Sequence, residues 1–262
     1  MTNIVALDGQ THRALRVAVA GARGEHASIS IVGVIPREFP RLLAHYPIFF
    51  VKSPETGQFE PAALLGFATG ENLFFSEGEW DVAYVPLQIQ RRPFALISRP
   101  GNPATGTEPS LDLALDLSSP HVSPQHGERL FQDDGQPSPF LHSVSSMMKA
   151  LVAGSREAHA FAGKLAELNL LEPVRVEIEF VDASDTQLQG LYWIAADGLK
   201  ALAGAQLAEL RDREYLEWMY FQMASLAHVS GLVDRKNRRL SGVTPASRGG
   251  VGGGGAGDAA QG

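Results

Sequence analysis

The sequence has no cysteine, no long hydrophobic run and no excess of basic residues, and each absence excludes a class of protein. Without cysteine, the chain of 262 residues has no disulfide, no thiolate nucleophile and no zinc–sulfur site. No apolar run reaches the roughly 18 residues that a membrane-spanning helix needs, so we expect no membrane insertion. The formal net charge of -7 argues against a nucleic-acid partner, because nucleic-acid binders usually carry a basic face.

Targeting and nucleotide-binding signals are missing as well. Residues 1–8 have no basic segment followed by an apolar core, so they do not resemble a secretory signal, and we expect a cytoplasmic protein. The chain has no phosphate-binding loop and no Gly-x-Ser-x-Gly elbow. We expect no cofactor.

The remaining composition is that of an ordinary globular protein, with 44% hydrophobic and 19% charged residues. Strand-like runs cover the first half and one later hairpin; they are 28–34, 48–51, 62–67, 73–75, 94–97, 111–117, 174–181 and 188–194. A short helix is predicted from Pro36 to Tyr46. A long apolar stripe predicts a helix that begins at Ser138 and Pro139, and Gly154 and Gly163 leave open whether it is one kinked helix or two.

Strands and helices are mixed without a regular βαβ alternation. This favours an α+β fold, with a mixed, mostly antiparallel sheet packed against long helices from the C-terminal half. We expect one domain over residues 1–240, with a subdomain joint inside 99–138, and a disordered glycine-rich tail over 241–262. A last long helix is predicted over 205–233. It is apolar around much of its girth, so it packs against the sheet or forms a homo-oligomer contact.

Residues 64–96 form the stretch around which the chain is organised. They combine many aromatic side chains with polar ones, and the candidate binding residues are Glu71, Asn72, Trp80, Asp81, Tyr84, Arg91 and Arg92. Aromatic residues and arginines dominate binding hot spots, and arginine holds a carboxylate through two parallel hydrogen bonds. These residues predict a protein or peptide partner. The alternative is local structure, with turns, caps and an arginine paired to Glu71 or Asp81.

Several spaced motifs in this stretch resemble those of the SapC family. They are Gly-Glu-Asn-Leu-Phe at 70–74, Trp-Asp-x-x-Tyr-Val-Pro at 80–86 and Arg-Pro-Phe at 92–94, with further matches at 46–51, 127–135, 170–173 and 190–192. The resemblance covers roughly residues 1–235. It implies a bacterial accessory protein of a surface-layer, modification or outer-membrane uptake system. Because the sequence has no complete catalytic constellation but a dense aromatic and polar stretch, we expect a non-enzymatic binding protein. Some family members carry the label peptidase, so the alternative is a peptide hydrolase.

Two patterns bear on catalysis and metal binding. Ser146 and Lys149 have the Ser-x-x-Lys spacing, which places a hydroxyl and an amine on one helical face and would suit a Ser-Lys hydrolase. The further elements of such enzymes are missing, so these two are weak catalytic candidates. His121 and His126 are the closest histidine pair but lack a metal-binding spacing, and we expect no metal site.

Overall fold

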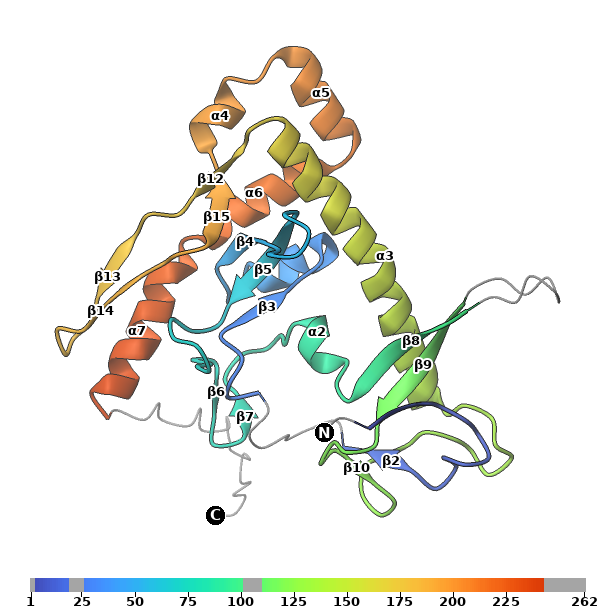
Figure 1. Cartoon of the computed structure of the whole chain (residues 1–262). Coiled ribbons are helices and arrows are strands. Elements are labelled where there is room, and N and C mark those ends of the chain that lie inside the picture. Colours follow the sequence, from blue (N-terminus) through green and yellow to red (C-terminus); the bar gives the residue numbers. More distant parts are fainter. Residues whose placement is uncertain (1–2, 19–25, 101–109, 243–262) are drawn as a thin grey trace, which may run out of the picture.

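The computed structural model describes residues 3–18, 26–100 and 110–242. Figure 1 shows a central sheet, a group of helices around it, and a second set of strands that lies apart from the first. The predicted glycine-rich tail falls, apart from its first two residues, outside the described residues.

The central sheet has five antiparallel strands in the order β12-β15-β4-β5-β3. Their bounds are Leu171–Pro173 for β12, Leu191–Ile194 for β15, Ile48–Lys52 for β4, Phe59–Leu64 for β5 and Ile31–Gly33 for β3. Consecutive residues of the middle strands β4 and β5 are buried, so both faces of the sheet are covered. Short, fully apolar runs in the sequence predict such buried strands. Beyond β12 and β15 the same hairpin continues as β13 (Glu177–Glu179) and β14 (Asp185–Gln187).

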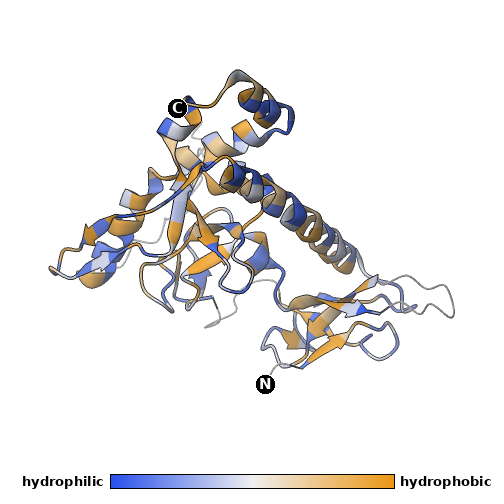
Figure 2. Ribbon diagram, turned by 45° about the horizontal axis from the view of Figure 1, so that its top comes forward, coloured by the Kyte–Doolittle hydropathy of each residue, from blue (hydrophilic) through white to orange (hydrophobic). Residues whose placement is uncertain are grey.

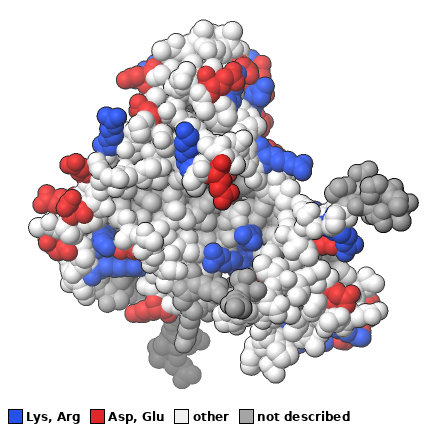
Figure 3. Space-filling model, viewed as in Figure 1, with Lys and Arg blue, Asp and Glu red and all other residues white. Residues whose placement is uncertain are grey.

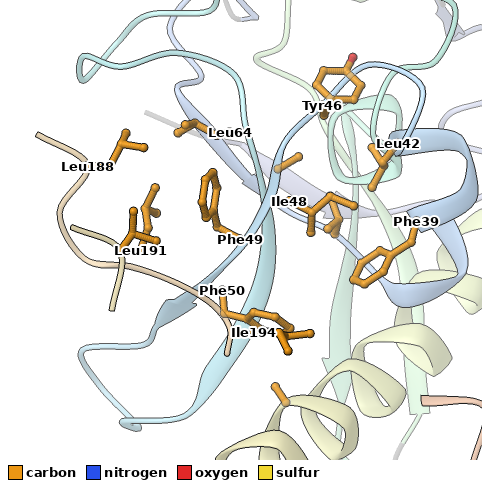
Figure 4. Packing of buried hydrophobic residues seen from close by; sticks show 14 of the residues in the cluster. Phe39, Leu42, Tyr46, Ile48, Phe49, Phe50, Leu64, Leu188, Leu191 and Ile194 are labelled. Carbon is orange, nitrogen blue, oxygen red and sulfur yellow. The ribbon is translucent and has the colours of Figure 1, made fainter. Parts of the chain in front are cut away.

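Helices close the core over this sheet. They are the 3₁₀ helix η1 (Pro36–Glu38), α1 (Phe39–Leu42), α4 (Ala196–Lys200), α5 (Gly204–Asp212), α6 (Tyr215–Ser225) and α7 (His228–Leu240). Figure 4 shows side chains of β4, β5, β15 and α1 pointing into this core. Phe161 from α3 lies at its centre, with ring centroids 5.9 Å from Phe50 and 5.1 Å from Tyr215.

A second hydrophobic cluster forms around a separate three-stranded sheet of order β1-β9-β8. Its strands are β1 (Ile4–Ala6), β9 (Ser110–Asp116) and β8 (Phe94–Arg99). A smaller sheet of β10 (Val122–Ser123), β2 (Arg16–Val17) and β11 (Glu128–Arg129) lies beside it. The hairpin of β6 (Phe75–Ser76) and β7 (Glu79–Trp80) and the short helix α2 (Leu87–Gln90) lead from the first cluster to the second.

One helix, α3 (Pro139–Glu167), joins the two clusters, as Figures 1 and 2 show. The hydroxyl oxygen of Ser138 accepts a hydrogen bond from the Leu141 backbone N–H at 3.1 Å, which confirms the predicted N-cap. The helix runs unbroken for 29 residues, so this region forms one helix and not two. Its first half contributes Val144 and Met148 to the second cluster, and its second half contributes Phe161 and Leu165 to the first.

The predicted α+β fold with antiparallel strands is confirmed, but the single helix predicted over 205–233 is wrong. That region forms three helices, α5, α6 and α7. Glu214 has a left-handed backbone (φ 64°), which ends α5 and redirects the chain into α6. A second turn at Leu226 and Ala227 separates α6 from α7. The strand predicted at 73–75 is also shifted, to β6 at Phe75–Ser76.

Candidate functional site

A cavity of about 580 Å³ opens where the two hydrophobic clusters meet, and its volume falls in the range of ligand sites in proteins. Its walls come from the segment before α2, from α2, from the start of β8 and from the N-terminal half of α3. The lining residues are Val17, Ala83, Tyr84, Val85, Leu87, Gln90, Arg92, Phe94, Phe140, Ser143, Val144 and Met147. The walls are therefore mostly apolar, with a few polar groups that could fix the orientation of a ligand.

Arg92 is the charged residue of this lining. Its side chain forms no hydrogen bond and no ion pair with any residue in the described ranges, and the residue is exposed. The neighbouring Arg91 is held in place by neutral groups, with its Nε donating to Gln88 Oε1 at 2.6 Å and its Nη1 to the Phe94 carbonyl at 2.9 Å. Burial lowers the pKa of the Arg91 guanidinium, and the charge of Arg92 lowers it further. The two guanidinium groups therefore create positive potential that no acidic partner among the described residues neutralises.

The surface view agrees with this local excess of positive charge. In Figure 3, basic side chains lie close to the position where Figure 1 shows the chain passing from α2 into β8, and no acidic side chain adjoins them in that view. An anionic group of a ligand would meet an available arginine there. Arginine suits a carboxylate because its planar donors match both oxygens.

Tyr84, on the cavity wall, is held by a hydrogen bond to a buried carboxylate. Glu38 is 2% exposed and its Oε1 accepts hydrogen bonds from the Tyr84 hydroxyl and from the Leu87 backbone N–H, each at 2.8 Å. Its Oε2 accepts from the Ile35 N–H at 3.1 Å. Burial raises the pKa of Glu38 above its ordinary value, against the opposing effect of these hydrogen bonds. One carboxylate thus positions two residues of the lining.

Two further contacts hold Tyr84. The Tyr46 hydroxyl donates to the Tyr84 carbonyl at 2.7 Å, and the Arg41 guanidinium lies 5.4 Å from the centre of the Tyr84 ring. Burial raises the pKa of both tyrosines well above the usual range, with the charge of Glu38 contributing at Tyr84. Tyr84 is therefore held at two points, because its hydroxyl donates to Glu38 and its carbonyl accepts from Tyr46.

Glu71 and Asp81 pair with α7, far along the chain, and not with Arg91 or Arg92. The Lys236 Nζ lies 2.6 Å from Glu71 Oε1, and the Arg235 Nη1 lies 2.8 Å from Asp81 Oδ2. The backbone N–H groups of Phe67 and Ala68 also donate to Glu71. Burial alone would raise the pKa of Glu71, but the hydrogen bond from Lys236 and those from the backbone lower it below its ordinary value.

Asn72 and Trp80 belong to the packing between the β6–β7 hairpin and the segment at His26. Asn72 is 0% exposed; its side-chain amide donates to the His26 carbonyl at 2.8 Å and its Oδ1 accepts from the Phe74 N–H at 2.9 Å. The Trp80 Nε1 donates to His26 Nδ1 at 3.2 Å. Asn72 is thus fully buried, and its side-chain amide forms hydrogen bonds within the fold.

The candidate binding residues therefore fall into two groups. Tyr84 and Arg92 line the cavity and Arg91 lies directly beside it, whereas Glu71, Asn72, Trp80 and Asp81 hold the preceding segment in place. Binding by any of them remains a prediction. The sequence did not point to Glu38 or to the α3 residues Phe140, Ser143 and Met147. The signal for Phe140 and Met147 was the apolar stripe of α3, which contributes to both the core and the cavity, whereas no sequence pattern marked Ser143.

The pairing of Ser146 with Lys149 finds no support in the geometry. Both residues are exposed on α3, the Ser146 hydroxyl donates to the His142 carbonyl at 3.0 Å, and neither residue is part of the cavity lining. Within the described ranges, no three histidine, cysteine, aspartate or glutamate side chains gather in a way that could hold a metal ion.

The family model SapC matches residues 7–232. The chain belongs to the SapC family. No curated protein and no solved structure matches the chain.

The SapC match includes every residue of the cavity lining, from Val17 to Met147. Two of the motifs that carry the resemblance, at 80–86 and 92–94, supply Tyr84, Val85, Arg92 and Phe94 to its walls. In the part of the chain that the structure describes, no helix is both long and apolar enough to cross a membrane.

Proposed function

We propose that this SapC protein is a non-enzymatic binding protein that takes a protein or peptide segment into the cavity between its two hydrophobic clusters. The observation that carries the proposal is the combination of apolar walls with Arg92, an exposed arginine that lacks an acidic partner among the described residues. In this proposal an apolar side chain of the partner fills the cavity and a carboxylate of the partner pairs with Arg92. The proposal includes a cytoplasmic location and an accessory role in a surface-layer, modification or uptake system.

Three features support a binding role for the residues that line the cavity. Aromatic and arginine side chains supply large contact areas and directional bonds, and such residues dominate binding energy at interfaces. Ligand sites occur preferentially at the junction between packed units, which is where this cavity lies. Glu38, Tyr46 and Arg41 hold Tyr84 in one arrangement before a partner arrives, which reduces the entropy lost on binding.

A displacement experiment tests the proposal without knowledge of the natural partner. The fluorescent dye anilinonaphthalene sulfonate, which has an apolar body and one negative charge, is bound to the full chain and then displaced by a peptide. The peptide is an acetylated hexapeptide that alternates threonine with valine and ends in phenylalanine, prepared with a free carboxylate and as an amide. We expect the free acid to displace the dye at a concentration at least about tenfold lower, because hydrogen bonds to charged groups contribute roughly 1.5–3 kcal/mol.

Matched arginine variants identify the group responsible. Arg92→Met should abolish the preference for the free acid, whereas Arg156→Met should retain it, because Arg156 is an exposed arginine of α3 outside the cavity. Equal displacement by acid and amide in the wild type would contradict the proposal. Mass spectrometry of the recovered peptide adds a second control: we expect intact peptide, and cleavage would favour the hydrolase alternative.

A further inference from the structure

The hydrogen-bonding pattern of the three-stranded sheet leaves one edge of β8 unpaired. On the β1 side of β9, the Leu7 N–H donates to the Leu113 carbonyl at 2.9 Å and the Leu117 N–H donates to the Asn3 carbonyl at 2.8 Å. In an antiparallel pair, alternate residues direct their N–H and C=O groups to the same neighbour. Leu113 therefore faces β1, as do the residues two positions before and after it.

The intervening residues of β9 face β8. The Asp116 N–H donates to the Pro93 carbonyl at 3.1 Å, next to the paired residues Phe94 and Leu115. Continuing this register, Ala95 bonds with Ala114 and Ile97 bonds with Asp112. Leu96 and Ser98 alternate with these residues, so their backbone N–H and C=O groups point away from β9 to the outer edge of the sheet.

No described strand pairs with the outer edge of β8. In the sheet order β1-β9-β8, β8 has a strand on one side only. The backbone groups of Phe94 are already used, because its N–H donates to the Arg91 carbonyl at 2.7 Å and its C=O accepts from Arg91 Nη1. Leu96 and Ser98 have no such bond to any described residue, and Ser98 is exposed. Unpaired edges of this kind are templates for an added strand.

The open edge leads directly to the cavity. Phe94, the first residue of β8, lines the cavity together with Arg92, and Ser143 and Met147 of α3 form the wall beyond. We propose that an extended peptide segment adds as a strand to the β8 edge at Leu96 and Ser98, with its carboxyl end in the cavity at Arg92. This inference rests on the proposed function and specifies the partner as an extended segment that ends in a free carboxylate after an apolar residue.

The position of Arg92 also fixes the direction of the added strand. Arg92 precedes the N-terminal end of β8, so a segment whose C-terminus reaches it runs antiparallel to β8. Backbone bonds to Leu96 and Ser98 then supply affinity that does not depend on the peptide sequence, and the apolar walls select the last side chain. This division of roles is that of peptide recognition by strand addition.

Amide hydrogen exchange, measured residue by residue by NMR on the full chain, tests the proposed pairing. In the free protein, the amides of Ala95 and Ile97 should exchange slowly and those of Leu96 and Ser98 quickly. Saturation with the hexapeptide acid should slow exchange at Leu96 and Ser98 at least tenfold and leave Ile97 nearly unchanged. If the peptide displaces the dye but Leu96 and Ser98 keep their fast exchange, strand addition is wrong and the cavity still binds. If the peptide does not displace the dye at all, the proposed function fails.

A pair of proline variants gives an independent readout. Proline is tolerated on an edge strand where its missing N–H would face solvent. Ser98→Pro should therefore keep the melting temperature of the wild type and weaken peptide binding about fivefold, whereas Ile97→Pro should lower the melting temperature. Peptides N-methylated at alternate amides provide the same test without changing the protein, because only the set that faces β8 should lose binding. Equal losses for both methylated sets would overturn the proposal.

Discussion

At the residue scale, the buried Glu38 and the half-buried Glu71 show how the same side chain acquires opposite pKa shifts. Burial raises the pKa of Glu38 above its ordinary value of 4.5, although three hydrogen bonds oppose the shift. At Glu71 burial acts in the same direction, but the hydrogen bond from Lys236 and two from the backbone outweigh it, and the pKa falls below 4.5. A full ionic partner distinguishes the second site from the first.

These shifts predict opposite pH dependences of the free energy of unfolding. Glu38, with its raised pKa, contributes stability that is present below the unfolded pKa and is lost as pH rises through the folded pKa. Glu71, with its lowered pKa, contributes stability that is present above the unfolded pKa and is lost as pH falls through the folded pKa. Urea unfolding of the wild type, Glu38→Gln and Glu71→Gln from about pH 3 to pH 7 measures both. The advantage of the wild type over Glu38→Gln should shrink with rising pH and that over Glu71→Gln should grow; parallel trends would contradict the assignment.

At the scale of single elements, α3 contains two glycines with different roles. A Cβ at Gly154 would lie 2.5 Å from Cδ1 and 2.8 Å from Cβ of Ile35, so the glycine allows the segment before η1 to approach the helix closely. A Cβ at Gly163 would meet nothing within 4 Å, and the residue is exposed. The first glycine is required by packing, and the second only weakens the helix.

Alanine substitutions should therefore change stability in opposite directions. Gly163→Ala should raise the free energy of unfolding by about 1 kcal/mol, the difference in helix propensity between the two residues. Gly154→Ala gains the same propensity but forces Ile35 to move, and overpacking costs about 1–3 kcal/mol. Thermal and urea unfolding of both variants gives the comparison. If both substitutions stabilised the protein, the close approach of Ile35 to α3 would be wrong.

Elements with strong local signals were predictable from the sequence, whereas those set by distant partners were not. Ser138, Pro139 and the regular apolar spacing were sufficient for α3, because cap and stripe are local features. The break at Glu214 carries no glycine or proline, so nothing local separated α5 from α6. At the site, Tyr84 and Arg92 were found by residue type alone. The ion pair of Glu71 with Lys236 joins positions 165 residues apart, and a single sequence has no signal for it.

For the molecule as a whole, the question is whether the two hydrophobic clusters unfold together. α3 contributes side chains to both, and the cavity lies at their junction. Ile35 of the second cluster precedes η1, whose neighbour α1 belongs to the first, so the chain crosses the junction there as well. These shared elements favour a single cooperative unit, and the single domain expected over 1–240 stays a prediction.

The tryptophans provide a direct test, because Trp80, Trp193 and Trp218 all pack against the first cluster. Their fluorescence therefore reports on that cluster alone. Leu115→Ala removes a fully buried side chain of the second cluster and should cost about 2–5 kcal/mol. If unfolding is cooperative, this substitution lowers the urea midpoint seen by tryptophan fluorescence as much as the midpoint seen by circular dichroism. Phe161→Ala, in the first cluster, is the positive control, with an expected cost of about 3–5 kcal/mol. A fluorescence midpoint that Leu115→Ala leaves unchanged would show two independent units, and the cavity would then lie between parts that can move relative to each other.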